Sequence, residues 1–212
     1  MLDQIQTITS SEGYLKGGGI KILEVLFTPW ENTELKIRLE IFIEFDYGER
    51  TETQTWEISC KGTWGSKGIE HPKIPHTQIK LLKDHPVLWD DDDSSYYSVK
   101  GTCENIPEFM GDLYIAHKSI CGDWIDFHRL YSSLPETLKT QRENQLKIPN
   151  RLQKSCFEVF DKHGIKYEIN EVEKKRIDYY VLFFSTPDIW PDDQNFMQAY
   201  VIAEYFEEVR IT

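Results

Sequence analysis

Apolar and polar side chains alternate with a period of two between residues 35 and 45. The odd positions hold Leu35, Ile37, Leu39, Ile41, Ile43 and Phe45. Four of the five intervening positions are charged. A strand places alternate residues on opposite faces, whereas a helix would spread these apolar residues around its circumference. The pattern therefore predicts a half-buried strand.

Further strands are predicted around this segment. Asp46-Tyr47-Gly48-Glu49 is a turn sequence, and Trp56, Ile58 and Cys60 alternate with polar residues after it. These signals predict a hairpin of residues 34–46 with residues 51–61, in which Trp56 and Ile58 lie opposite the row of Ile and Leu residues at the odd positions from 35 to 43. An earlier strand is expected at 20–27 and later ones at 78–82 and 96–103. Residues 62–77 are expected to form a loop because Gly and Pro interrupt them.

The apolar spacing changes after residue 104. Steps of three and four predict helices beginning at Pro107, Ile125, Pro135 and Asn150, and a closing helix over 196–206. Alternation predicts a late pair of strands at 165–169 and 178–185. The second of these is apolar on both faces, which is typical of a central strand covered on both sides.

The predicted fold class is therefore α+β. A mostly antiparallel N-terminal sheet, single or folded into a sandwich, is followed by helices, the late strand pair and a C-terminal helix. Residues 1–19 are expected to be a flexible lead-in, 20–104 the β region, and 105–212 an α+β region that packs on it. The change of spacing leaves open whether these regions form one domain or two.

The net charge of the chain limits the classes of partner that it is expected to bind. The 212 residues include 24 Lys and Arg against 36 Asp and Glu, a net charge of −12. Residues 1–104 carry −7 and 105–212 carry −5, so neither half offers the basic surface that nucleic acids or anionic membranes require. A basic protein is the partner that this charge favours.

The four cysteines form no CxxC pair, and the first ten residues lack the basic and apolar parts of a secretion signal. No segment approaches the roughly 20 apolar residues that span a bilayer. The chain is therefore expected to be a soluble cytoplasmic protein with reduced thiols.

Two groups of residues are candidates for chemistry. His71, His76 and His85 lie close in sequence and could supply nitrogen ligands to a metal, although their spacing matches no zinc motif. His117 and Cys121 are four residues apart on a predicted helix, with His128 nearby, which could make a Cys/His nucleophile pair or equally a metal site. The alternatives are surface histidines in the first group, and a buried cysteine beside a hydrogen-bonded histidine in the second.

A third group consists of residues suited to contact a protein. Asp90, Asp91, Asp92 and Asp93 form an acidic run without calcium-loop spacing, and Trp190 lies in a second acidic loop. Trp64, between glycines, has few apolar neighbours and is a candidate for an exposed contact.

No GxSxG, HExxH, Walker or GxGxxG motif is present. The function is thus expected to be non-enzymatic and without a cofactor: a module that neutralises or regulates a basic protein. A metal- or thiol-dependent enzyme and a β domain with an apolar ligand pocket are the alternatives.

Overall fold

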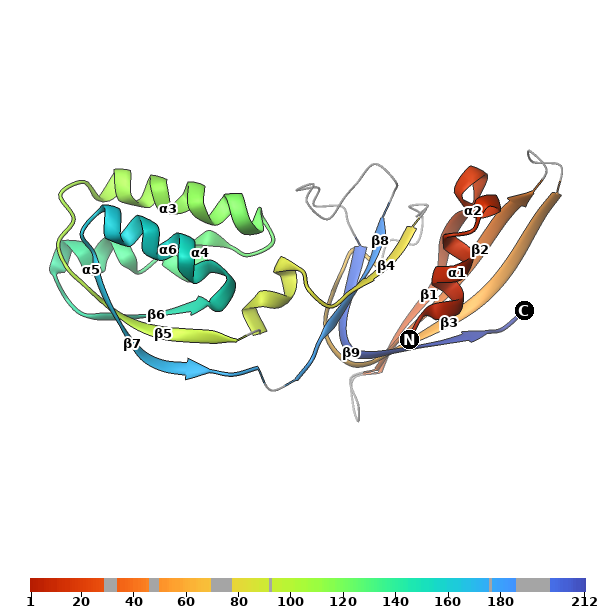
Figure 1. Cartoon of the computed structure of the whole chain (residues 1–212). Coiled ribbons are helices and arrows are strands. Elements are labelled where there is room, and N and C mark those ends of the chain that lie inside the picture. Colours follow the sequence, from red (N-terminus) through yellow and green to blue (C-terminus); the bar gives the residue numbers. More distant parts are fainter. Residues whose placement is uncertain (29–33, 46–49, 70–77, 92, 176, 186–198) are drawn as a thin grey trace. The chain divides into compact units, whose positions relative to one another are not determined.

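The chain folds into two compact units (Figure 1). The structure, a computed structural model, describes residues 1–28, 34–45, 50–69, 78–91, 93–175, 177–185 and 199–212. Unit 1 comprises Met1–Asp84 and Ile177–Thr212, and unit 2 comprises His85–Arg176. Unit 2 is therefore an insertion in the chain of unit 1.

Unit 1 is built on an antiparallel sheet with the strand order β1-β2-β3-β9-β8-β4. Its strands are β1 (Gly19–Thr28), β2 (Glu34–Phe45), β3 (Arg50–Lys67), β4 (Gln78–Leu82), β8 (Tyr180–Ser185) and β9 (Ala199–Arg210). The predicted β2–β3 hairpin is confirmed, because Leu39 pairs with Trp56 and Ile37 with Ile58. The strand β3 is longer than expected and includes Trp64.

The apolar face of this sheet carries the core of unit 1. Alternate residues of β2 from Leu35 to Ile43 are buried, together with Leu2, Ile5 and Tyr14 of the N-terminal segment. That segment forms α1 (Asp3–Thr9) and α2 (Glu12–Gly17), which lie against the sheet in Figure 1, rather than a flexible lead-in.

The first turn of α1 is held by a side chain from β9. Glu208 accepts hydrogen bonds from the main-chain nitrogens of Gln4 and Ile5, at 2.8 and 3.0 Å. A carboxylate at a helix N-terminus satisfies unpaired amides and complements the helix dipole. This contact joins residues that stand at opposite ends of the sequence.

The predicted C-terminal helix is wrong, because Ala199–Arg210 form the strand β9. Val201 and Ile202 are adjacent and both buried, since β9 lies between β3 and β8 and is covered on both faces there. Burial on both faces hides the period of two, so the remaining apolar residues happened to fit helical steps. The neighbouring strand β8 is central and buried on both faces over Val181–Phe184, as predicted.

Unit 2 has a three-stranded antiparallel sheet with the order β6-β5-β7 and helices on one side of it (Figure 1). Its elements are the 3-10 helix η2 (Pro86–Asp91), β5 (Ser94–Lys100), α3 (Ile106–Cys121), α4 (Phe127–Tyr131), α5 (Leu134–Thr140), β6 (Asn144–Pro149), α6 (Asn150–Lys162) and β7 (Lys166–Glu173). Tyr97 and Val99 of β5 are buried with Phe109 and Leu113 of α3 and Phe160 of α6.

The α+β class is confirmed, but the regions divide differently from the prediction. Residue 104 lies inside unit 2, because β5 pairs with β6 and β7 and with no described strand of unit 1. The change of apolar spacing there marks the start of α3, not a boundary between units. In the described part of the chain, no helix is both long enough and apolar enough to cross a membrane.

Candidate functional site

The candidate nucleophile pair lies in the core of unit 2. His117 and Cys121 are one turn apart on α3, and both are buried. His117 Nε2 lies 3.2 Å from Cys121 Sγ and 2.8 Å from the main-chain oxygen of Ile125. Since a carbonyl oxygen can only accept, Nε2 carries a proton and donates it to Ile125. The Cys121 thiol donates to the main-chain oxygen of His117 at 3.3 Å.

This environment opposes formation of a thiolate. Burial raises the pKa of Cys121 to about 12 and lowers the pKa of His117. A protonated Nε2 cannot take the thiol proton, and Nδ1 is buried without a hydrogen-bond partner among the described residues. A nucleophilic cysteine needs a lowered pKa and solvent access. The geometry supports a structural role, in which His117 ties α3 to the segment that follows it.

The third candidate of this group stands apart from the pair. His128 is exposed on α4, and its main-chain nitrogen donates to the side chain of Asp126 at 2.9 Å, which caps that helix. No hydrogen bond between described residues joins His128 to His117 or Cys121. All four cysteines of the chain are free thiols.

Of the candidate metal ligands, His71 and His76 lie outside the described residues. His85 is buried, its Nδ1 accepts from the main-chain nitrogen of Val87 at 3.2 Å, and its ring meets Trp124 edge-on with centroids 4.7 Å apart. Within the described ranges, no three His, Cys, Asp or Glu side chains are placed to hold a metal ion. His85 therefore contributes to the packing of unit 2.

Among the candidate contact residues, Trp64 lies in β3 beside a register shift and is 51% exposed. Its exposure was predicted from its sparse apolar neighbours, although its strand was not. Its ring lies 6.3 Å from that of Tyr179. Trp190 lies outside the described residues. Partner binding by either residue stays a prediction.

The acidic run is divided between two environments. Asp90 and Asp91 end η2, whereas their side chains and all of Asp92 lie outside the described parts of the structure. The Asp93 side chain accepts a hydrogen bond from the main-chain nitrogen of Lys175 at 2.6 Å, and the Asp93 main-chain oxygen accepts one from the main-chain nitrogen of Asn150 at 2.9 Å. Asp93 thus has a structural role in closing unit 2, beside any role in binding.

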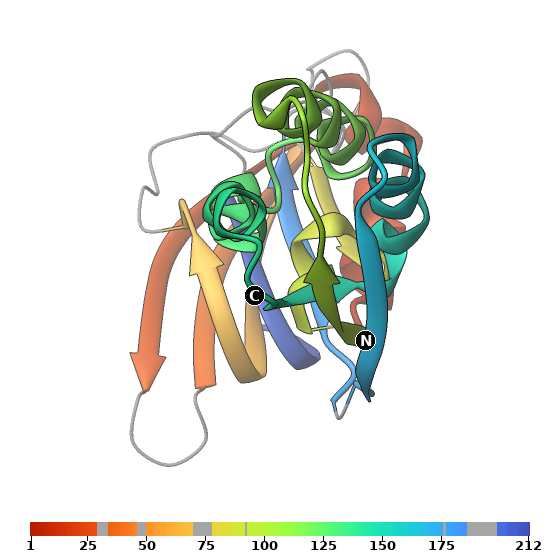
Figure 2. The ribbon, with the colours of Figure 1, turned by 90° about the vertical axis from the view of Figure 1, so that its left-hand side faces the viewer.

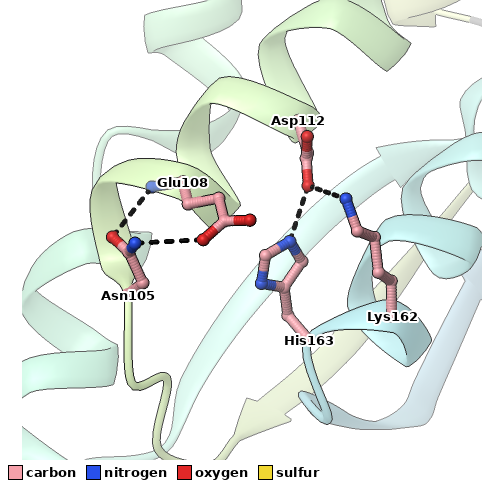
Figure 3. A network of polar contacts seen from close by, with 5 residues as sticks. All are labelled: Asn105, Glu108, Asp112, Lys162 and His163. Carbon is pink, nitrogen blue, oxygen red and sulfur yellow. Dashed lines mark hydrogen bonds and ion pairs between the residues drawn. The ribbon is translucent and has the colours of Figure 1, made fainter.

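A polar network that the sequence did not reveal joins α3 to the end of α6 (Figure 3). Asp112 accepts hydrogen bonds from Lys162 Nζ at 2.6 Å and from His163 Nε2 at 2.7 Å. Lys162 and then His163 hold the pKa of Asp112 below its usual value. Asn105 caps the start of α3 by accepting a hydrogen bond from the main-chain nitrogen of Glu108 at 3.2 Å, and its side-chain amide donates to the Glu108 carboxylate at 3.0 Å.

This network is suited to holding two helices together. In the described structure no hydroxyl or thiol shares a hydrogen bond with His163, so the Asp112–His163 pair has no nucleophile to activate. The sequence held only a weak signal for it, since Asp112 and His163 lie in different elements and either could have faced solvent.

The most exposed strand of unit 2 is β7, which forms one edge of its sheet (Figure 2). Residues 168–172 are all exposed, whereas the neighbouring β5 is buried at five of its seven positions. Ile169 and Val172 are 57% and 52% exposed. At the start of β7, Tyr167 is covered by Phe157 of α6, whose ring stacks on it at 4.2 Å. Side chains of α6 therefore cover β7 at Tyr167 but no longer at Ile169.

The register assigns the exposed residues of β7 to two faces. Ile169 pairs with Tyr97, a core residue, so Ile169 and Val172 point to the helix-bearing face. The carboxylates of Glu168, opposite Ser98, and Glu171, opposite Tyr96, lie on the other face. Ile169 and Val172 are three residues apart, as are Glu168 and Glu171, so in a regular strand the members of each pair would lie on opposite faces. A register shift near Asn170 adds one residue to β7 and brings the members of each pair onto the same face. We call Glu168, Ile169, Glu171 and Val172, with the free backbone side of their strand, the β7 edge.

The carboxylates of the β7 edge differ from their neighbour in pairing. Glu173, just beyond them, is bound by Lys147 at 2.9 Å and by the Tyr96 hydroxyl at 3.2 Å. Glu168 and Glu171 form no ion pair within 4.0 Å with any described residue. Lys100, whose pKa is raised by Glu143 and less strongly by Glu168, is bound to Glu143 at 3.0 Å, so the carboxylate oxygens of Glu168 and Glu171 remain open to a further cation.

No protein-family model matches the chain, and no curated protein sequence shows significant similarity to it.

Proposed function

We propose that this protein is a non-enzymatic interaction module that recognises a basic protein through the β7 edge. The observation that carries the proposal is the run of five exposed strand residues, with two exposed apolar side chains and two carboxylates that form no ion pair within 4.0 Å with a described residue. Exposed apolar groups beside charge are typical of binding surfaces, and unpaired edge strands attract other chains.

The charge of both units supports a cationic partner. Unit 1 holds 20 acidic and 11 basic residues, net −9, and unit 2 holds 16 and 13, net −3. A negative field of this kind accelerates encounter with a basic protein, and close carboxylates then select the orientation. The His117–Cys121 pair is buried and neutral, which argues against a catalytic role for it.

Affinity capture tests the proposal with charge-matched variants. The bait proteins are the unmodified chain, E168K/E171K at the β7 edge, and E104K/E136K, whose exposed carboxylates lie elsewhere in unit 2. Both variants change the net charge equally, so a difference between them reports position and not overall attraction.

We expect a basic protein to be captured by the unmodified chain and by E104K/E136K, and to be lost with E168K/E171K. It should elute as salt is raised above about 0.15 M, where the screening length falls below about 8 Å. Equal capture by all three baits, or capture only of acidic proteins, would overturn the proposal.

A further inference from the structure

We infer that the basic partner contributes an extended segment that joins unit 2 as a fourth strand beside β7. Its apolar residues face Ile169 and Val172, and its Lys or Arg residues face Glu168 and Glu171. The inference rests on the proposed function, because it specifies how the β7 edge is used.

The backbone of β7 provides the first argument. As an edge strand, β7 pairs with β5 and with no other strand among the described residues, so about half of its amides and carbonyls point away from the sheet. Such a row is a template for an incoming strand, and main-chain hydrogen bonds then supply affinity without regard to sequence.

The side chains provide the second argument, since they make the edge selective. Successive residues of an added strand would point alternately to the helix-bearing face and to the opposite face. On the first they would meet Ile169 and Val172, and on the second Glu168 and Glu171. Opposite charges across strands stabilise a strand pair, so an alternating apolar and basic segment fits both faces.

The same charges disfavour a second copy of this chain as the occupant. An antiparallel pair of β7 strands centred between Ile169 and Asn170 would place Glu168 of each copy opposite Glu171 of the other. Like charges directly opposite one another destabilise a strand pair. Each copy also carries a net charge of −12, which adds to the repulsion.

Three synthetic peptides test the inference on the full chain. The first alternates Lys and Val, the second has the same composition with the Lys and Val residues in separate blocks, and the third is the alternating peptide with every second amide N-methylated. Affinity is measured for each, and amide hydrogen exchange is followed in β7 and in β6. The other edge strand, β6, is an internal control in the same sheet.

The alternating peptide should bind at least about tenfold more tightly than either control peptide, because the block peptide cannot match its side chains to both faces and the methylated peptide has lost half of its amide donors. Exchange should slow in residues 166–173 and stay unchanged in 144–149. The variants I169S and V172S should weaken the alternating peptide more than the block peptide.

Equal affinity of the alternating and block peptides would overturn strand addition while leaving the proposed function standing. So would binding of the captured partner without any change of exchange in β7. Protection of β7 in the protein alone, rising with its concentration, would show that a second copy occupies the edge and would also overturn the inference. Failure of the proposed function itself is recognised separately, by equal capture with E168K/E171K and E104K/E136K.

Discussion

Leu82 of β4 and Val181 of β8 are cross-strand partners, although the whole of unit 2 lies between them in the sequence. The chain therefore leaves unit 1 and returns to it on adjacent antiparallel strands. Within unit 2 the two ends also meet, because Asp93 accepts a hydrogen bond from the main-chain nitrogen of Lys175 at 2.6 Å. The two ends of the inserted unit 2 are therefore held close by the pairing of β4 with β8 in unit 1 and by the hydrogen bond between Asp93 and Lys175 in unit 2.

We predict that residues 85–176 fold on their own. They have their own core, and their ends need no support from unit 1 to stay close. The isolated segment should show helical and strand circular dichroism and a cooperative urea transition. A matching chain with residues 85–176 replaced by a short Gly/Ser linker should retain the unit 1 sheet. A disordered 85–176 segment would contradict the assignment of two units.

The core of unit 2 can be tested with two substitutions on one helix. Leu113 is fully buried on α3, whereas Ile115 on the same helix is 67% exposed. L113A should lower the free energy of unfolding by about 2–5 kcal/mol, because it leaves a cavity. I115A should change it by less than about 0.5 kcal/mol. Urea denaturation measures both, and similar losses for the two variants would show that α3 packs differently.

Sequence pattern predicted the strands with one buried and one solvated face, and also β8, whose unbroken apolar run marked it as covered on both sides. The alternation from Leu35 to Phe45 identified β2, and the turn sequence with the alternation around Trp56 identified β3 and the face that it shares with the Ile/Leu row. Sequence pattern failed for β9, where Val201 and Ile202 are both buried, and for α1, whose position depends on Glu208 at the far end of the chain. Long-range contacts of this kind leave no local period.

In the candidate sites too, the local spacing of residues could be predicted from the sequence, whereas burial and long-range contacts could not. The contact of His117 with Cys121 could be predicted from their spacing on a helix, but their neutral state depends on burial and on Ile125. The β7 edge could not be predicted, because the exposure of Ile169 depends on where α6 stops covering the sheet. The acidity that suggests a basic partner is, by contrast, a property of composition.

The contact of Asp112 with Lys162 and His163 should make the free energy of unfolding depend on pH. Lys162 and His163 lower the pKa of Asp112 in the folded state, so its contribution is present above the unfolded value of about 3.9 and is lost as pH falls through the folded value. D112N should therefore have a lower urea midpoint than the unmodified protein at pH 7. The difference between the two midpoints should shrink as pH falls through the lowered pKa of Asp112.

The matched control for this comparison is E104Q, which neutralises an exposed carboxylate that has no ion pair with a described residue. It should shift the midpoint less than D112N at pH 7. A D112N midpoint equal to that of the unmodified protein at every pH would show that the contact adds nothing to stability.

Thiol labelling tests the alternative that the protein is a thiol enzyme. Burial raises the pKa of Cys121 to about 12, so alkylation by iodoacetamide at pH 7.5 should be slow in the native protein and fast after denaturation. Half-buried Cys103 is the internal comparison and should react first. Mass spectrometry of the digested protein measures both sites. Native labelling of Cys121 that is faster than that of Cys103 would restore the catalytic hypothesis.

The most direct test of the β7 edge is the salt dependence of affinity for the captured basic partner. Dissociation constants at about 0.05 and 0.3 M salt should differ by at least about tenfold for the unmodified chain and for E104K/E136K, and by much less for E168K/E171K. An affinity that does not change with salt, or a salt dependence in E168K/E171K as large as that of the unmodified chain, would contradict recognition at this edge.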